Sequence, residues 1–155
     1  MKKQILTYSG KVGLLRVTKN SLRAKGEILI FETSYSSLNA MFTKKQAEEI
    51  RNEFINKKIK IRELTNQAYH EPYTEIEGYH EKVMNIRYIS PNKLKINMET
   101  LIYNNVVTIY EAKKDGFCLE IYSKELADQQ RQLFEFVWKQ ADRPIIGRGG
   151  RTSIS

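Results

Sequence analysis

Residues 101–110, LIYNNVVTIY, decide how the second half of this chain folds. Branched and aromatic residues, which favour strands, stand on both sides of the Asn104-Asn105 pair. Asparagine tolerates the positive φ that a tight two-residue turn requires, so the stretch predicts a β-hairpin with this pair at its tip. Such a hairpin is either scaffold or the carrier of a site, on its tip or on the strand that leads into it.

More short strands surround the hairpin at close spacing. Residues 83–89, 93–97 and 117–122 are rich in branched and aromatic residues, and Pro-Asn and Asp-Gly turn signals bound them. Close strand spacing with tight turns predicts that these strands add antiparallel hairpins to the sheet.

The first half alternates strands with helices. Residues 3–9, 27–33 and 58–64 predict strands, and the apolar run of 27–33 is typical of a strand buried on both faces. Between these strands, one predicted helix ends at Gly26 and another begins after Thr43, which forms a capping-box pattern with the Gln three residues on. The order strand, helix, strand, helix, strand predicts a parallel sheet covered by helices.

The remaining segments are a loop, a helix and a tail. Residues 65–82 break periodicity and predict a loop with room for one helical turn. Ser123 caps an amphipathic helix, whose apolar stripe comprises Leu126, Gln130, Leu133, Phe134, Val137, Trp138 and Ala141. We therefore expect a single α/β domain over residues 1–142 and a flexible basic tail over residues 143–155.

The composition is that of one globular domain. The chain has 155 residues, of which 41% are hydrophobic and 10% aromatic, so it can bury a core. No apolar run approaches the roughly 20 residues that a membrane span needs, and the N-terminus turns polar too soon for a signal peptide. The single cysteine, Cys118, cannot form an internal disulfide, and its strand pattern would bury it as an inert thiol. We expect a cytoplasmic protein without a membrane partner.

The charge balance raises nucleic acid or another polyanion as a partner. The net charge is +8, from 26 lysines and arginines against 18 acidic residues. The basic residues are scattered along the chain, which also fits a solvated basic surface without a specific partner. The candidate nucleic-acid contacts are Lys58, Lys60, Arg62, Arg148 and Arg151.

Few residues are suited to catalysis or metal binding. His70 and His80 lie among glutamates, and imidazole and carboxylate groups together bind several divalent ions. Their spacing of ten residues across a loop matches no zinc-ligand pattern, so ordinary polar loop residues are the alternative. We expect no metal and no cofactor.

Two groups of residues are candidate ligand contacts. The first is a strand-to-helix turn, where free backbone N–H groups can hold an anion, although a plain turn needs no ligand. The second follows two parallel strands at their carboxyl ends, where α/β sheets usually bind ligands, although loops are polar in any case. The first group comprises Ser9, Gly10, Lys11 and Gly13, and the second comprises Thr33, Ser34, Tyr35, Ser36, Thr65 and Asn66, with Glu32 and Gln67 beside them.

Two long strings resemble parts of one known family. Residues 8–33 resemble the strand, Gly-Lys-x-Gly helix and strand that open the C-terminal effector region of TrmB-like transcriptional regulators. Residues 99–141 are similar to its closing part: a hairpin, a strand, and a helix with a Phe-x-x-x-Trp-x-x-Ala pattern that begins at Phe134. The resemblance covers residues 4–142. It implies a phospholipase D-like α/β fold with a mixed sheet, parallel in the first half and antiparallel in the second, and a C-terminal amphipathic helix.

The same resemblance gives a test for catalysis. Active phospholipase D-like enzymes carry H-x-K on the strand that leads into this hairpin, followed after four further residues by Asp. Laid over this chain, those positions fall on Ile96, Met98 and Tyr103 in one register and on Asn97, Glu99 and Asn104 in the next. Neither register supplies an imidazole nucleophile or a lysine, so we expect a protein that is not an enzyme. A rearranged site around His70 or His80 is the catalytic alternative.

The family's regulators also carry an N-terminal winged helix that binds DNA, and the resemblance begins too early in this chain to include one. We therefore expect a non-catalytic regulatory or effector domain that forms a homodimer and binds a small ligand or anion. DNA contact would then come from a DNA-binding partner chain. A nucleic-acid-binding protein that uses its basic surface and tail is the alternative. The resemblance assigns no sugar-binding residue to this sequence.

Overall fold

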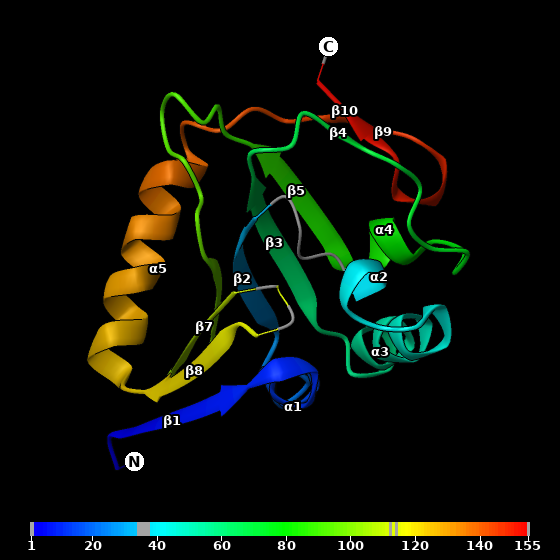
Figure 1. The fold of residues 1–155 in the computed structure, drawn as a ribbon. Coiled ribbons are helices and arrows are strands. Elements are labelled where there is room, and N and C mark those ends of the chain that lie inside the picture. The colour runs from blue at the N-terminus through cyan, green and yellow to red at the C-terminus, as the bar shows by residue number, and fades with distance from the viewer. Residues whose placement is uncertain (1, 34–37, 112, 114, 155) are drawn as a thin grey trace.

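The computed structural model describes residues 2–33, 38–111, 113 and 115–154. Its main feature is a seven-stranded sheet with the strand order β1-β8-β7-β6-β2-β3-β5 (Figure 1). These strands are β1 (Gln4–Ser9), β2 (Glu27–Glu32), β3 (Lys60–Thr65), β5 (Met84–Tyr88), β6 (Glu99–Tyr103), β7 (Val106–Tyr110) and β8 (Phe117–Tyr122). β2, β3 and β5 run parallel, whereas the other neighbours pair antiparallel. The sheet is therefore mixed, as predicted.

Helices cover both faces of this sheet. The helices α1 to α4 lie on one face, and α5 lies alone on the other (Figure 1). They are α1 (Gly10–Ser21), α2 (Leu38–Met41), α3 (Lys44–Asn56), α4 (Tyr79–Val83) and α5 (Lys124–Trp138). Within the described ranges, every helix is too short or too polar to cross a membrane.

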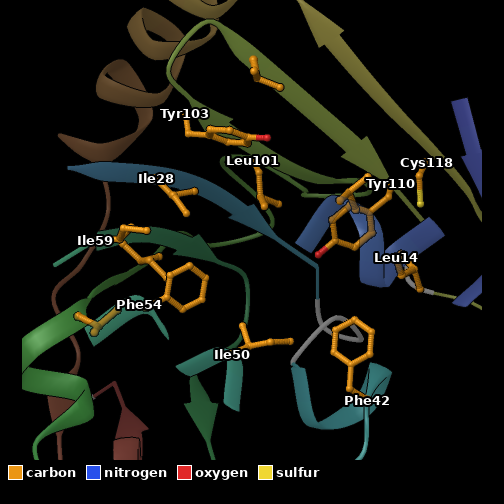
Figure 2. Close-up of a cluster of buried hydrophobic side chains, with 14 of the residues drawn as sticks. Leu14, Ile28, Phe42, Ile50, Phe54, Ile59, Leu101, Tyr103, Tyr110 and Cys118 are labelled. Carbon is orange, nitrogen blue, oxygen red and sulfur yellow. The ribbon is translucent and has the colours of Figure 1, made fainter. Parts of the chain in front are cut away.

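Alternating side chains along the strands supply two hydrophobic cores. In β2, Ile28 belongs to the core under α1 to α4, whereas Leu29 belongs to the core under α5. β6 repeats the alternation with Leu101 and Ile102. Figure 2 shows the first core, in which Phe54 of α3 lies on the same side of the sheet as Ile28 and Leu101. Burial on both faces explains the continuous apolar run in the sequence of β2.

The predicted hairpin is present and is tied to the first half of the chain. β6 and β7 pair with Tyr103 opposite Val106, and Asn104 has a φ of 49°. The Asn104 side chain accepts a hydrogen bond from Lys25 N (2.9 Å) and donates one to Arg23 O (3.0 Å). The turn therefore closes the hairpin and also anchors the loop between α1 and β2.

Two predicted helix starts are confirmed. In the capping box of α3, the Thr43 hydroxyl accepts from Gln46 N (3.2 Å) and the Gln46 side chain accepts from Thr43 N (3.1 Å). Ser123 caps α5, since its hydroxyl accepts from Leu126 N (3.3 Å). These contacts satisfy N–H groups that have no partner within the helix itself.

β1 departs from the predicted parallel arrangement. It pairs antiparallel with β8 at one edge of the sheet, with Gln4 opposite Tyr122, and does not adjoin β2. Its half-exposed alternation, in which Ile5 is 67% exposed, suits an edge strand better than the buried centre of a parallel sheet. The prediction that β1 runs parallel to β2 was therefore wrong.

The strands that follow α4 also differ from the predicted hairpins. β5 runs parallel to β3, because the connection over residues 66–83 is long enough for a crossover. Residues 93–97 form no strand. Asn66 donates to Leu94 O and accepts from Ile96 N, both at 2.8 Å, so this side chain takes the backbone groups that a strand partner would use.

The segment predicted as a flexible tail is folded. It forms β9 (Ile145–Ile146), the 3-10 helix η1 (Arg148–Gly150) and β10 (Thr152–Ser153). β10 lies between β9 and β4 (Tyr69–His70) in a separate three-stranded sheet. Strands of two residues leave no periodic signal, and Thr152 lies 82 residues from its partner His70, so local patterns could not reveal this pairing.

The apolar stripe of α5 packs inside the domain. Phe134 is fully buried, with its ring centroid 5.3 Å from that of Phe31 in an edge-on contact and 5.5 Å from that of Trp138 in a stacked one. Trp138 is only 6% exposed. Both rings therefore belong to the second core of a single chain.

Replacing Phe134 with alanine should lower the free energy of unfolding by about 3 to 5 kcal/mol, because it deletes a fully buried ring. Urea denaturation followed by circular dichroism measures this loss. Phe136→Ala is the matched control, since Phe136 lies on the same helix and is 69% exposed. Equal losses in the two variants would contradict the assignment of the buried face.

Candidate functional site

A cavity of about 500 Å³ lies between the sheet and the helices α1 to α4. It runs along one face of β2 and β3 and reaches their carboxyl ends, and the segment that follows β3 forms part of its wall. The carboxyl ends are the edge at which α/β sheets usually bind ligands, and the volume is in the range of small-molecule pockets. Its apolar wall includes Ile28, Ile30, Met41, Phe54, Ile61 and Leu101.

Three glutamates line this cavity from three adjacent strands. Glu32 ends β2, Glu63 lies near the end of β3, and Glu99 begins β6. The parallel pairing of β2 with β3 aligns their ends, and the antiparallel pairing of β2 with β6 brings the start of β6 to the same place. Their exposed fractions are 8%, 8% and 3%, respectively. The sheet therefore gathers three carboxyl groups where little water reaches them.

Burial changes the protonation of this cluster. Burial, and then the charges of Glu32 and Glu99, raise the pKa of Glu63 well above its ordinary value. The Glu63 carboxyl can then hold its proton in a hydrogen bond with Glu32. Glu99 accepts hydrogen bonds from Thr33 N (2.9 Å) and the Thr33 hydroxyl (3.3 Å), which fix its carboxyl group at the cavity wall.

Tyrosine rings form much of the remaining wall. Tyr73 and Tyr79 meet edge-on, with their ring centroids 6.2 Å apart. The Tyr110 hydroxyl points toward the carboxyl end of β2 (Figure 2). Burial, and then the nearby Glu99 and Glu32, raise the pKa of Tyr110, and burial likewise raises the pKa values of Tyr73 and Tyr79. All three hydroxyls therefore keep their protons at neutral pH and can donate hydrogen bonds.

Arg51 of α3 is a buried cation at the cavity wall. Its Nη1 donates to Glu48 Oε1 (2.7 Å), and its guanidinium carbon lies 5.1 Å from the centroid of the Tyr73 ring. Glu48 also accepts from the Thr74 hydroxyl (2.9 Å). The charge of Arg51 is thus compensated by a carboxylate that is not part of the cavity cluster.

His70 connects the cavity to the C-terminal segment. Its Nδ1 lies 2.9 Å from Thr152 Oγ1 of β10, and its Nε2 lies 3.4 Å from Glu32 Oε2. Nearby, a Cβ on Gly150 would lie 2.2 Å from Tyr73 Cε1, so only glycine fits against that ring. The segment containing η1 and β10 therefore packs behind two residues of the cavity wall.

The two histidines lie in different surroundings. His80 does not line the cavity, and its Nδ1 lies 3.0 Å from the Tyr73 hydroxyl. Burial lowers the pKa of His80, which favours its neutral form. Among the described residues, no three His, Cys, Asp or Glu side chains are arranged to hold a metal ion.

The polar residues predicted at the strand ends are only partly at the cavity. Gln67 lines it, and Thr33 positions Glu99. Thr65 is buried, and its hydroxyl accepts a hydrogen bond from Gln67 N (3.0 Å). The Asn66 side chain donates to Leu94 O (2.8 Å). Both residues therefore have structural contacts. The predicted contacts Ser34, Tyr35 and Ser36 lie outside the described residues.

The predicted anion site at the start of α1 is separate from the cavity. Ser9, Gly10, Lys11 and Gly13 do not line it. Gly10 N donates to Gly116 O (3.3 Å), so this backbone donor has a partner within the protein. A Cβ on Gly13 would lie 2.8 Å from Tyr8 Cβ, so close packing explains that glycine without a ligand. Anion binding at this turn stays a prediction.

The predicted nucleic-acid contacts do not form one surface. Lys58 and Lys60 are exposed at the amino end of β3. Arg148 and Arg151 are exposed in the segment that pairs with β4, beyond the carboxyl end of β3. The two pairs therefore lie at opposite ends of the parallel strands.

Arg62, the fifth member of that set, joins β3 to α5. It forms ion pairs with Glu27 and Glu135. Its guanidinium carbon also lies 5.4 Å and 5.3 Å from the ring centroids of Phe134 and Trp138. These contacts give Arg62 a structural role, so it is a poor candidate for a phosphate contact.

Sequence reasoning missed Glu63, Glu99 and Tyr110 as cavity residues. Glu63 did carry a signal, since it stands two residues after Ile61 at an inward position of a strand, where alternation predicts an apolar side chain. In the sequence, Glu99 stands out only as a position where a lysine of the phospholipase D-like pattern is missing. No signal in the sequence distinguishes Tyr110 from an ordinary core aromatic residue.

Replacing Glu63 with glutamine should stabilise the protein at about pH 8. The pKa of Glu63 is higher in the folded state, so its favourable contribution is present at low pH and is lost as the pH rises toward the folded value. Glutamine is neutral and can donate to Glu32 at every pH. We expect a gain of about 1 kcal/mol, which raises Tm by about 2 to 4 °C and disappears at about pH 4. Differential scanning calorimetry over this pH range measures it.

Glu120→Gln is the control for that measurement. Glu120 is fully buried on β8, but both of its oxygens accept from Asn20 Nδ2, at 2.9 and 3.1 Å. Glutamine would replace one of these acceptors with a donor, so Glu120→Gln should lower Tm. A lower Tm for Glu63→Gln at about pH 8 would contradict the described state of the cluster.

No protein-family model matches this chain, and no significant match is found among curated proteins. Solved structures do resemble it. The archaeal chromatin protein TrmBL2, reported to show a novel mode of DNA binding, superimposes with a TM-score of 0.62 and 14% identity, over 90% of this chain and 54% of TrmBL2. This chain thus spans about half the length of that neighbour.

Two further neighbours are matched over almost their whole length. Nuc, a phospholipase D family member from Salmonella typhimurium, has a TM-score of 0.64 and 12% identity, over 92% of this chain and 98% of Nuc. NucT from Helicobacter pylori has a TM-score of 0.60 and 12% identity, over 92% of this chain and 99% of NucT. Identities this low show a shared fold alone. This protein therefore has the phospholipase D-like fold, which it shares with a TrmB-like protein.

Proposed function

We propose that this protein is a non-catalytic regulatory domain that binds a small molecule in the cavity between the sheet and α1 to α4. The cavity carries the proposal: it measures about 500 Å³ and reaches the carboxyl ends of β2 and β3. An apolar wall with a few convergent polar groups is the usual composition of a small-molecule site.

The non-catalytic part of the proposal rests on the reactive groups. In one register of the sequence resemblance, Glu99 stands where phospholipase D-like enzymes place a lysine, and the cavity holds two more glutamates there. Phosphodiester chemistry needs cations to hold the phosphate, and a carboxylate-rich wall repels it. Cys118 is fully buried, which raises the pKa of its thiol to about 11, so it lacks the thiolate that a nucleophile requires.

The regulatory part rests on which elements meet at the cavity. Its lining comes from the main sheet, from α1, α2, α3 and α4, and from the segment that contains β4 of the small sheet. A bound ligand would therefore contact both layers and stabilise one arrangement of them, which is how a ligand shifts a conformational equilibrium. The predicted homodimer, like the DNA-binding partner chain, stays a prediction.

A thermal-shift screen of a metabolite library tests this function. A ligand at about 100 times its Kd should raise Tm by roughly 5 to 10 °C. Ile30→Phe should reduce the shift, because it places a larger side chain in the cavity wall and narrows the space for the ligand. Val12→Phe, at a position that is 79% exposed on α1, is the control that should respond like the wild type. A library without a stabilising compound, or a shift unchanged by Ile30→Phe, would count against the cavity as the site.

Direct nucleic-acid binding is the second candidate function. The net charge of +8 supports it, as does the likeness in fold to a protein reported to bind DNA. Arg148 and Arg151 are the exposed pair on which this candidate depends, since Arg62 has carboxylate partners.

If these two arginines contact phosphates, DNA affinity should fall steeply with salt. Fluorescence anisotropy with duplex DNA at several salt concentrations gives the slope of log K against log salt. The double variant Arg148→Ala, Arg151→Ala should reduce that slope by about 1.8, at about 0.9 for each lost phosphate contact. Substituting the other exposed predicted contacts, Lys58 and Lys60 at the opposite end of β3, by alanine is the comparison, and it should leave the slope unchanged if Arg148 and Arg151 make the phosphate contacts. No measurable binding at low salt would remove this candidate.

A further inference from the structure

The charges that face the cavity are unbalanced. Glu32, Glu63 and Glu99 meet there, and no lysine among the described residues lines it. Its basic side chains already have partners: Arg51 pairs with a glutamate on its own helix, and His70 Nε2 lies 3.4 Å from Glu32. The cavity therefore has more acidic than basic groups.

The surroundings of Glu63 also favour a positively charged ligand. Glu63 is 8% exposed, and none of the ion pairs among the described residues includes it. Its hydrogen-bond neighbour is Glu32, which is itself a carboxyl group. A buried carboxylate without a basic partner opposes folding, and a cation bound in the cavity would relieve that cost.

The rings around the carboxyl groups also suit a cation. Tyr69, Tyr73, Tyr79 and Tyr110 all line the cavity. The face of an aromatic ring attracts ammonium groups within about 6 Å of its centroid. Tyr73 already makes such a contact with Arg51, and Tyr69 makes one with Arg151. The Tyr79 and Tyr110 rings are therefore the better candidates for a ligand's ammonium group.

The size and apolar wall exclude a bare metal ion as the fitting occupant. The cavity is about 500 Å³, far larger than one ion, and Ile28, Phe54 and Ile61 line it. In the part of the chain that the structure describes, no group of three ligating side chains could hold a metal ion. The fitting occupant is an organic molecule whose apolar body fills the space beyond the carboxyl groups.

We infer that the cavity binds an organic cation, an ammonium group on an apolar body. The ammonium group lies among Glu32, Glu63 and Glu99, and the body packs against the apolar and tyrosine wall. This inference rests on the proposed function and adds the chemical class of its ligand. Phosphorylated or carboxylated ligands are disfavoured because the same carboxyl groups repel them.

Three probes with one body and different charges test the inference: phenylbutylamine, phenylbutanol and phenylbutanoate. Each is titrated into isotope-labelled protein at neutral pH, and NMR shift changes give the affinity and the residues affected. The amine should bind at least about ten-fold more tightly than the alcohol, as a charge-assisted hydrogen bond provides, and the acid should bind most weakly. The shift changes should centre on the cavity residues.

Two variants separate the carboxylate contact from other effects. Glu63→Gln should reduce amine affinity by about ten-fold and leave alcohol affinity unchanged, because a bound ammonium group displaces the Glu63 proton into solvent and pairs with the carboxylate, which glutamine cannot supply. Glu99→Gln should act in the same direction and serves as a second, independent variant. Glu120→Gln, a buried glutamate outside the cavity, should leave both affinities unchanged.

The possible outcomes test the organic cation and the small-molecule site separately. Equal binding of amine and alcohol at the cavity would overturn the organic cation and leave a small-molecule site of another class. A preference for the acid would overturn it more strongly. Shift changes outside the cavity, or binding by none of the three probes, would contradict both the inference and the proposed site.

Discussion

The pairing of β2 with β3 on one side and with β6 on the other is the constraint on which the rest of the structure depends. The register places Phe31 opposite both Leu64 and Thr100, so these three residues point toward α5. Side chains alternate along a strand, and the glutamates at the ends of these strands therefore point to the opposite face. If either pairing slipped by one residue, a glutamate side chain would point to the other face of the sheet, into the aromatic core beneath α5.

The pairing of β2 with β3 and β6 also brings carboxyl groups together in the cavity, which costs electrostatic free energy. Three carboxyl groups on neighbouring strands repel one another, and the fold places them where water screens them poorly. Elsewhere in the same sheet, a buried glutamate does have a hydrogen-bond donor: Glu120 accepts from the Asn20 side-chain amide. One buried acid is thus satisfied within the chain, while the cavity group is left with a surplus of acid. Such a local conflict is more typical of a binding site than of a scaffold.

Much of the fold could be predicted from the sequence, because the evidence for it is local. The Asn104 turn, the Thr43 and Ser123 caps and the apolar stripe of α5 all follow from residues within a few positions of one another. The position of β1 and the pairing of β10 with β4 could not be predicted, since they depend on partners more than 80 residues away. The cavity edge was predicted from the parallel strands, but Glu99 reaches it only through the antiparallel β6, whose neighbour the sequence did not reveal.

The pairing of β1 with β8 also determines the order in which the sheet can be completed. Among the described residues, the sheet neighbour of β1 is β8 at residues 117–122, so β1 stays without this partner until those residues have been synthesised. Contacts of this sequence separation close large loops and slow folding. The parallel part of the sheet, β2-β3-β5, needs no residue beyond 88 and can assemble earlier. During synthesis β1 therefore cannot join the main sheet before β8 is present, and until β1 pairs with it the outer edge of β8 lies open.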